Sequence, residues 1–357
     1  MSFSRKKVII ALSGGVDSSA AAFILKKKNY DLIGIYFKNG TINDKAEEQA
    51  RKLARFLKIP FFTINLSFQF KKEVIDYFID GYDQGLTPNP CVQCNKSIKF
   101  GQLFKISKEL GAQFLATGHY IKIKKEKEFN LYKPKDALKD QTYFLYNLNQ
   151  NILKHCLFPL GEYSKKEIRK IAEKEKLAFL EKESQDICFL IKDGKAINHN
   201  EFLREKISSK KGPIKNLDEK IIGEHNGLAF YTIGQRKGID IGGTGPYYAL
   251  RKDYENNTLY VVDDPNHNLL FSKSFSVSDV NWINDLENKF PLKCEVLIRY
   301  RHKPVSCILS KDDNFTKNKK YIVNLDKPER AISPGQSAVF YTGNRLLGGG
   351  IISFANI

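Results

Sequence analysis

Short apolar runs alternate with amphipathic stretches through about the first 120 residues of the chain. Buried strands are predicted where apolar residues follow one another without a break, over residues 8–12, 32–37, 61–64 and 114–116. Helices are predicted where apolar residues recur at helical spacing, over residues 17–28, 44–57, 71–80 and 95–110. Strands that alternate with helices predict an α/β fold with a doubly wound parallel sheet, which binds ligands at the carboxyl ends of its strands.

The pattern changes after about residue 205. Residues 168–176 predict one more helix and residues 186–191 one more strand, and helical periodicity then fades. Short Val, Ile and Tyr runs follow between Gly, Pro and Asn turns, which is typical of small β domains and barrels. We therefore predict three domains, namely an α/β domain over residues 1–200, a small linking β domain over 201–268 and a C-terminal β-barrel over 269–357.

Composition and charge narrow the class of protein. Hydrophobic residues make up 42% and charged residues 27%, so a mainly disordered chain is excluded. The 58 Lys and Arg exceed the 40 Asp and Glu by +18, which favours a polyanionic partner, although a Lys-rich solvated surface gives the same balance. No apolar run is long enough to span a bilayer, and the first run is too short for a signal peptide. We expect a cytoplasmic protein without a membrane partner.

A glycine- and serine-rich loop, Ser13-Gly14-Gly15-Val16-Asp17-Ser18-Ser19, lies between the first predicted strand and the first helix. Two glycines allow a tight turn, and the amino terminus of the helix presents backbone amides that suit a phosphate group. The loop lacks the Lys of a Walker loop and the spacing of a dinucleotide fingerprint. An ordinary turn with a helix cap is the structural alternative, but a strand before and a helix after favour phosphate binding.

This loop resembles the Ser-Gly-Gly-x-Asp-Ser loop of the PP-loop ATP pyrophosphatase family. The resemblance implies that ATP is cleaved between its α- and β-phosphates, which leaves pyrophosphate and an adenylated substrate. By the same resemblance, Asp17 would help to hold Mg²⁺ near the pyrophosphate.

The cysteines supply the second candidate chemistry. Cys91 and Cys94 form a Cys-x-x-Cys pair just before a predicted helix, and both features favour the thiolate by lowering the thiol pKa. A zinc site would need a second ligand pair, and a thioredoxin-type dithiol would follow the first strand. A catalytic thiol with a remote partner is left, and Cys188 is the candidate, although a lone cysteine in a strand is more often inert.

Eight motifs occur in an order that resembles the bacterial tRNA-specific 2-thiouridylase family over essentially the whole chain. They are Ala11–Ser18, Thr87–Pro90 with Cys94-Asn95, Ala116–Tyr120, Lys139–Leu145, Ile187–Phe189, Thr232–Arg236, Arg299–Arg301 and Pro334–Gln336. The resemblance implies ATP-dependent replacement of the C2 oxygen of the wobble uridine by sulfur, in the tRNAs for Lys, Glu and Gln. It also implies ATP and Mg²⁺ as cofactors, and tRNA and a sulfur donor, either a cysteine desulfurase or a sulfur-relay protein, as partners.

The resemblance assigns roles residue by residue. Cys94 matches the nucleophile and Cys188 the persulfide carrier, with a transient disulfide between them. The residues implied to bind ATP are Ala11, Leu12, Ser13, Gly14, Gly15, Val16, Asp17, Ser18, Phe37 and Gly118. Those implied to contact the target base are Asn89, Pro90 and Cys91, and those implied to bind tRNA are His119, Lys139, Asp140, Gln141, Arg299, Tyr300 and Gln336. The first domain would be catalytic, and the barrel would bind tRNA.

One position departs from the family pattern. Many relatives carry Asp where this chain has Cys91, so an acid–base role is not carried over to this residue. A second hypothesis is therefore that Cys91, Cys94 and Cys188 ligate an Fe–S cluster, as in some other PP-loop tRNA thiolases. Two alternative functions are another PP-loop adenylating ligase, such as an amidotransferase, and a non-catalytic RNA-binding protein. A hydrogen-bonded loop histidine is the alternative for His119.

Overall fold

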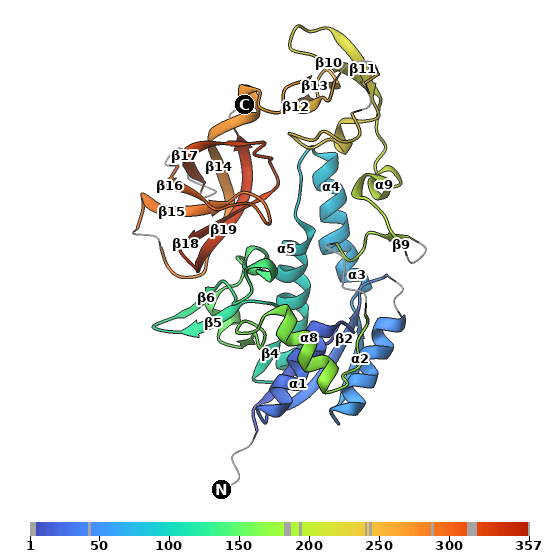
Figure 1. Ribbon diagram of the computed structural model, residues 1–357, viewed down its shortest axis with the longest axis vertical. Coiled ribbons are helices and arrows are strands. Elements are labelled where there is room, and N and C mark those ends of the chain that lie inside the picture. The colour runs from blue at the N-terminus through green and yellow to red at the C-terminus, as the bar shows by residue number, and fades with distance from the viewer. Residues whose placement is uncertain are drawn as a thin grey trace.

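The computed structural model describes residues 5–41, 44–181, 187–192, 195–239, 241–242, 245–286, 289–312 and 320–355. Its N-terminal part contains a five-stranded parallel sheet in the order β3-β2-β1-β4-β7 (Figure 1). The strands are β1 (Lys7–Ala11), β2 (Asp31–Lys38), β3 (Phe61–Asn65), β4 (Phe114–Ala116) and β7 (Cys156–Leu157). The four strands predicted in this region are confirmed, and β7 adds a short edge strand.

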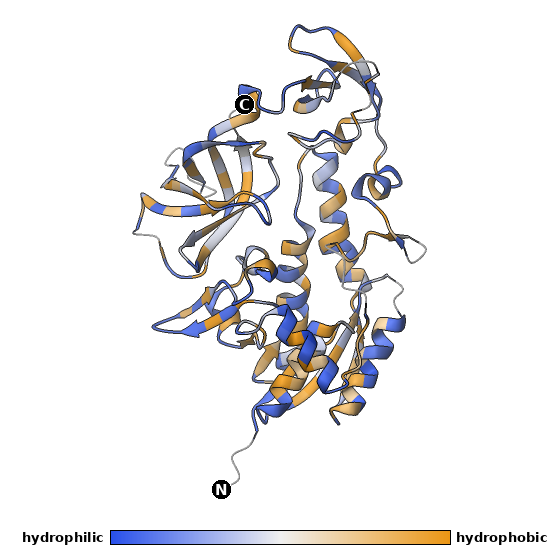
Figure 2. Ribbon diagram, in the orientation of Figure 1, coloured by the Kyte–Doolittle hydropathy of each residue, from blue (hydrophilic) through white to orange (hydrophobic). Residues whose placement is uncertain are grey.

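Helices cover both faces of this sheet, which is why consecutive residues of β1 are buried. Val8 and Ile10 pack with α1 (Val16–Lys27), α2 (Asp44–Phe56) and α8 (Lys165–Lys174). Ile9 packs on the other face with two long composite helices. Figure 2 shows α2 as largely hydrophilic and the strands that it covers as largely hydrophobic. The predicted doubly wound α/β fold is therefore confirmed.

Both composite helices contain a π-helical segment. The π-helix is rare in proteins overall, but where it occurs it is often part of a functional site. The first consists of α3 (Ser67–Phe70), η1 (Lys71–Asp76) and α4 (Tyr77–Asp83). The second consists of α5 (Pro90–Cys94), η2 (Asn95–Gln102) and α6 (Leu103–Glu109). Each starts before its predicted range, so the Cys-x-x-Cys pair lies inside a helix. The remaining short helices are η3 (Ala137–Lys139), η4 (Thr142–Phe144), α7 (Gln150–Leu153), α9 (His199–Arg204), η5 (Leu228–Phe230) and η6 (Asn268–Leu270).

Two β domains follow, as predicted. The first is a four-stranded sheet in the order β11-β10-β13-β12, built from β10 (Gly212–Lys215), β11 (Ile221–His225), β12 (Tyr248–Asp253) and β13 (Thr258–Val262). The second is a six-stranded antiparallel barrel, closed because β14 pairs with both β17 and β19. Its strands are β14 (Phe271–Trp282), β15 (Leu292–Leu297), β16 (Val305–Lys311), β17 (Tyr321–Arg330), β18 (Ser337–Thr342) and β19 (Arg345–Ala355). The exact domain bounds stay a prediction.

The barrel is joined to the N-terminal domain through the sheet itself. The hairpin β5 (Lys122–Lys125) and β6 (Phe129–Tyr132) belongs to the first part of the chain, yet β6 pairs with β19 (Figure 1).

The strand predicted over residues 186–191 is wrong for residues 187–190, which form a turn, while β8 (Ile191–Lys192) pairs with β9 (Lys195–Ala196). Cys188 therefore lies on a turn, where it is exposed.

Candidate active site

The glycine-rich loop leaves β1 and forms the start of α1. Gly14 has a φ of +75°, which favours glycine, and Gly15 is the N-cap of the helix. The Ser18 hydroxyl accepts from the Ser13 amide at 3.1 Å and donates to the Gly15 carbonyl at 3.0 Å. The backbone amide of Leu180 donates to the Gly14 carbonyl at 2.8 Å, which fixes the outer side of the turn. The loop is thus held in a shape whose amides can face an anion at the helix amino terminus.

Gly118 brings a second strand end against this loop. It follows β4, the neighbour of β1 on the side where the strand order reverses, which is where doubly wound sheets bind ligands. A Cβ atom on Gly118 would lie 2.9 Å from the Asp17 carbonyl carbon and from the Ser18 amide nitrogen, so a larger residue does not fit. The loop and Gly118, both predicted to bind ATP, are therefore in contact.

Asp17 forms an ion pair that the sequence did not predict. The Lys165 ammonium donates to both carboxylate oxygens at 2.7 Å, and the Tyr120 hydroxyl donates to one of them, also at 2.7 Å. Lys165 is the first residue of α8, which Ser164 and Glu167 cap reciprocally. The Ser-x-x-Glu pattern was a readable signal for the start of this helix, but not for its partner at the loop. Lys165 supplies the cation that the loop itself lacks.

Cys94 lies within a continuous helix, because capping starts that helix earlier than expected. The Asn89 side chain caps α5 by accepting from the amides of Cys91 at 3.2 Å and Val92 at 3.3 Å. Cys94 is 8% exposed, and burial raises the pKa of its thiol to about 11. The prediction of a lowered thiol pKa is therefore wrong. Desolvation of the buried thiol raises its pKa by more than the Cys-x-x-Cys spacing and the nearby helix amino terminus lower it.

Lys99 opposes this effect of burial on Cys94. It follows Cys94 by five residues, and η2 has the π form, in which residues five apart lie close to one face. The positive charge of Lys99 lowers the pKa of the Cys94 thiol and also that of the Cys188 thiol. Lys99 is the second residue that sequence reasoning missed, because its separation from Cys94 is not a spacing that places two residues on one face of an ordinary α-helix.

Cys188 reaches the same region from a distant part of the chain. Its charge raises the pKa of Cys94, so the two sulfurs interact electrostatically. The Asn39 amide, just after β2, donates to the Cys188 sulfur at 3.6 Å. The adjacent Phe189 anchors the turn, with its ring centroid 5.4 Å from those of Phe78 and Phe202. Although the surface of Cys188 is exposed, the protein packed around its sulfur desolvates the thiol and raises its pKa, whereas Lys99 and Asn39 lower that pKa.

The donor atoms of the site bear on which metal groups it could hold. Within the residues that the structure describes, no group of three or more His, Cys, Asp or Glu side chains is arranged to hold a metal ion. Cys91, Cys94 and Cys188, as they stand, do not fit an Fe–S cluster. Asp17 offers one carboxylate, which suits Mg²⁺ because this ion is commonly held by one or two carboxylates together with substrate phosphates.

The residues of the N-terminal domain expected to bind tRNA already have partners within the protein. His119 is buried and makes a 2.8 Å hydrogen bond through Nδ1 to the Thr117 hydroxyl, and burial lowers its pKa well below the usual value. The Asp140 carboxylate accepts from the Thr142 amide at 2.9 Å, and the Gln141 side-chain oxygen accepts from the Tyr120 amide at 2.8 Å. These groups hold the loop in place, and their contacts with tRNA stay a prediction.

Two barrel loops contact the N-terminal domain, one of them at the loop that precedes the Cys-x-x-Cys pair. The Gln336 amide donates to the Thr87 carbonyl at 2.8 Å, and the Thr87 amide donates to the Pro334 carbonyl at 2.8 Å. Tyr300 lies against Phe144, with 4.4 Å between ring centroids. The structure thus brings the predicted barrel residues Tyr300 and Gln336 to the N-terminal domain near the predicted target-base residues.

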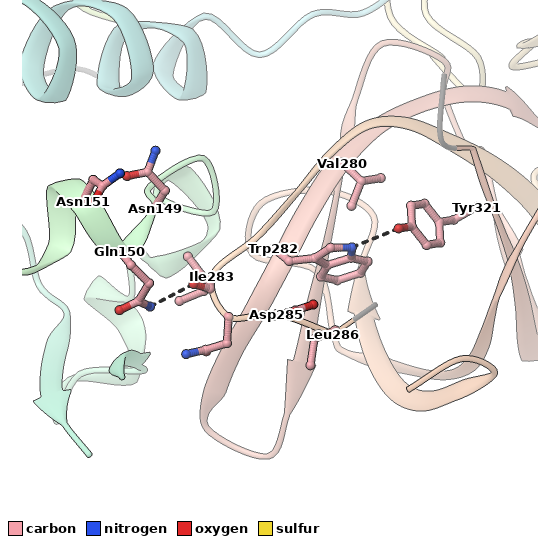
Figure 3. Close-up of a pocket in the computed structure, with 10 residues that line it drawn as sticks. Asn149, Gln150, Asn151, Val280, Trp282, Ile283, Asp285, Leu286 and Tyr321 are labelled. Atoms are coloured by element: carbon pink, nitrogen blue, oxygen red, sulfur yellow. Dashed lines mark hydrogen bonds between the residues drawn. The ribbon is translucent and has the colours of Figure 1, made fainter. Parts of the chain in front are cut away.

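A cavity of about 440 Å³ lies elsewhere, where the start of α7 meets the end of β14 (Figure 3). The Gln150 side-chain amide donates to the Ile283 carbonyl at 2.8 Å, and the Trp282 indole donates to the Tyr321 hydroxyl at 3.1 Å. None of the predicted site residues lines it. It is a joint between the barrel and the N-terminal domain rather than part of the candidate site.

A glycine- and serine-rich loop between a strand and a helix, at the topological switch of a parallel sheet, is the arrangement of an α/β domain of the PP-loop class. Three family models match consecutive parts of the chain. They are the tRNA methyl transferase HUP domain over residues 6–192, the tRNA methyl transferase PRC-barrel domain over 200–263 and the aminomethyltransferase beta-barrel domain over 272–352.

Full-length relatives are more specific. The tRNA-specific 2-thiouridylase MnmA of Coxiella burnetii (strain RSA 493 / Nine Mile phase I) is 41% identical over 367 residues, covering 98% of this chain and 99% of that protein. The protein of the same name from Legionella pneumophila (strain Lens) is 40% identical, covering 98% of each chain. The chain belongs to the tRNA-specific 2-thiouridylase family. The predicted family and the prediction of an enzyme are confirmed.

Among solved structures, the U34-tRNA thiolase NcsA from Methanococcus maripaludis, with its [4Fe-4S] cluster, is 22% identical with a TM-score of 0.36. The match covers 52% of this chain and 62% of that chain. In the described part of the chain, no helix combines the length and the apolar character needed to cross a membrane.

Proposed function

We propose that this protein uses ATP to replace the C2 oxygen of the wobble uridine by sulfur in the tRNAs for Lys, Glu and Gln, and that it releases AMP and pyrophosphate. Membership of the family supports the reaction class. The observation that carries the mechanism is that Phe189, the neighbour of Cys188, belongs to the same apolar core as Cys94, although the two cysteines lie far apart in sequence. The positive charge of Lys99 acts on both thiols.

Activation of the uridine belongs to the phosphate loop. The amides of Gly15 and its neighbours at the start of α1, with the Ser13 and Ser18 hydroxyls, would hold the pyrophosphate part of ATP. Mg²⁺, held by Asp17 and the phosphates, would neutralise charge on the leaving pyrophosphate. Lys165 lies 2.7 Å from both Asp17 oxygens and would hold this carboxylate in place. The uridine O2 attacks the α-phosphorus of ATP, which turns a poor leaving group into AMP.

Sulfur transfer belongs to the two cysteines. The terminal sulfur of a Cys188 persulfide attacks C2, and AMP leaves. The Cys94 thiolate then attacks the Cys188 sulfur and breaks the S–S bond, whose electron pair remains on the sulfur of 2-thiouridine. A Cys94–Cys188 disulfide results, and an external thiol reductant restores both thiols. Because burial raises the pKa of Cys94 to about 11, the charge of Lys99 would favour the thiolate that attacks.

The tRNA would lie against the barrel loops and the start of α5. The net charge of +18 favours a polyanion, and Arg299 and Tyr300 combine a cation with an aromatic ring at the joint between the domains. A sulfur donor, a cysteine desulfurase or a sulfur-relay protein, would meet Cys188, which is exposed on its turn.

Reconstitution tests this function. Purified protein is incubated with ATP, Mg²⁺, a persulfide donor and unmodified tRNA, and the tRNA is then digested and searched for 2-thiouridine by mass spectrometry. We expect 2-thiouridine together with equal amounts of AMP and pyrophosphate in the wild type. A Cys188→Ser variant is the matched control and should yield adenylated tRNA without 2-thiouridine. Wild-type protein that releases pyrophosphate but needs ammonia for its product would instead support the amidotransferase alternative.

A further inference from the structure

Asn39 donates a hydrogen bond directly to the Cys188 sulfur. It follows β2 directly, two residues after Phe37, which is implied to bind ATP. Its side-chain oxygen accepts from the Thr41 amide at 3.2 Å and from the Thr41 hydroxyl at 2.7 Å. A backbone N–H can only donate, so the oxygen of the Asn39 side chain must face Thr41. The NH₂ group is therefore the end that faces Cys188.

The orientation of the Asn39 amide matters because the two protonation states of a thiol differ as hydrogen-bond acceptors. A neutral thiol is a weak hydrogen-bond acceptor, whereas a donor that faces a sulfur anion makes the stronger, charge-assisted bond. The amide at 3.6 Å thus favours the Cys188 sulfur in its anionic form. Lys99 adds a positive charge that acts on the same sulfur.

The loop that carries Asn39 is fixed where it leaves β2. The Leu66 amide donates to the Lys38 carbonyl at 2.9 Å, which ties the end of β2 to the segment after β3. Gly40 has a φ of +89°, and a Cβ atom there would lie 3.6 Å from the Ser67 side chain. A strand end held in this way gives the amide a defined position, whereas the sulfur belongs to a turn.

We propose that Asn39 is a positioning residue for sulfur transfer, whose Thr41-oriented amide holds the anionic sulfur of Cys188 when this residue accepts sulfur from a donor. This inference rests on the proposed function. In the accepting step the Cys188 thiolate attacks the terminal sulfur of a donor persulfide. A new S–S bond forms at Cys188, the donor S–S bond breaks, and the donor leaves as a thiolate with its electron pair. The exchange has no net oxidation or reduction.

The test isolates this step from ATP and tRNA. Wild type, Asn39→Ala, Asn39→Asp and Thr41→Val are treated with a small-molecule persulfide carrying labelled sulfur, and the label on Cys188 is followed by peptide mass spectrometry. We expect Asn39→Ala to accept sulfur about tenfold more slowly, the effect of one lost hydrogen bond to a charged group. Asn39→Asp should be slower still, because it replaces the donor with an anion of nearly the same size.

Thr41→Val separates positioning from a general effect on folding. It keeps the Thr41 backbone amide but removes the hydroxyl that orients Asn39, so a smaller decrease in rate is expected. In the Asn39→Ala background the same change should add nothing, since Thr41 acts through the amide. Additive effects of the two changes would contradict the proposal. Pyrophosphate release with unmodified tRNA should stay at the wild-type rate in Asn39→Ala, whereas a parallel decrease would indicate a merely structural role and overturn it.

Two outcomes distinguish the inference from the function on which it rests. If wild-type Cys188 accepts labelled sulfur and Asn39→Ala and Asn39→Asp accept it equally fast, the role of Asn39 is refuted while the persulfide mechanism stands. If wild-type Cys188 accepts no sulfur from any persulfide donor, the proposed function fails and the inference with it. If Asn39→Ala does not fold, Thr41→Val alone decides, because wild-type transfer in that variant refutes the orienting contact.

Discussion

Replacing Asp17 by Asn tests the phosphate loop most directly. The substitution keeps the size of the side chain and one acceptor oxygen but removes the negative charge that faces Lys165. Both Asp17 oxygens lie 2.7 Å from the Lys165 ammonium, and the two side chains are 35% and 11% exposed, respectively. The variant therefore leaves a largely buried ammonium without its charged partner.

This geometry gives the expected size of two effects, the loss of stability and the loss of reaction rate. Breaking a fully buried ion pair costs about 3–5 kcal/mol and losing an exposed pair at most about 1 kcal/mol. Because Asp17 is about one-third exposed, solvent screens the pair, and we expect a loss of about 2 kcal/mol in the stability of the N-terminal domain. Loss of a metal-side carboxylate at the leaving pyrophosphate should remove about 3 kcal/mol of transition-state stabilisation, or about two orders of magnitude in rate.

The assay measures pyrophosphate release with ATP, Mg²⁺ and unmodified tRNA, and denaturant unfolding is followed in parallel. Glu167→Gln is the matched control, because the Glu167 pair with Lys135 is exposed and Gln can still complete the helix cap. We expect this control to leave pyrophosphate release and stability unchanged. Binding of tRNA should be retained in Asp17→Asn, which removes no predicted RNA contact. Pyrophosphate release at the wild-type rate in Asp17→Asn would refute the assigned role.

Three further predictions address the thiols and the RNA surface. Burial raises the pKa of Cys94 to about 11, so alkylation of this thiol should accelerate as pH rises toward 11. Lys99→Met should move the pH profile of alkylation to higher pH, because the positive charge of Lys99 lowers this pKa. An unmoved profile would show that Lys99 does not act on the Cys94 thiol. Cys188→Ser should form adenylated tRNA but transfer no sulfur from a persulfide donor, and labelled sulfur found on Cys94 would reverse the two roles. Lys139→Gln should flatten the slope of log affinity for tRNA against log salt by about one unit, and an unchanged slope would remove Lys139 from the contacts.

The parts of the fold that follow from local pattern could be predicted from the sequence. The strands of the parallel sheet were visible because residues such as Val8, Ile9 and Ile10 are buried on both faces and form a continuous apolar run. The phosphate loop was visible because its glycines and serines lie between a strand and a helix. The barrel was expected from short strands between turns, but the pairing of β6 with β19 depends on contacts between distant segments and has no local signal.

The site was predicted by residue type, and the structure supplies the environment that residue type does not contain. Cys94 was expected at a helix amino terminus, yet the Asn89 cap starts the helix earlier and buries the thiol. Lys165 lies 148 residues from Asp17, so no spacing rule connects them. Lys99 lies five residues from Cys94, a separation that suggests a shared face only when the helix has the π form.

The residues implied to bind tRNA show what these environments mean for recognition. The Gln141 side chain already accepts a hydrogen bond from the Tyr120 amide, and the Gln336 side chain already donates one to the Thr87 carbonyl. If RNA contacts these amides, it exchanges one hydrogen bond for another, and only the difference contributes to affinity. The affinity for tRNA would then come chiefly from the charged groups. The exchanged hydrogen bonds would instead alter the conformation of the loops that they now hold. Because Gln336 is bonded to Thr87 in the segment that leads into α5, an exchange at the barrel would act on the helix that carries Cys94.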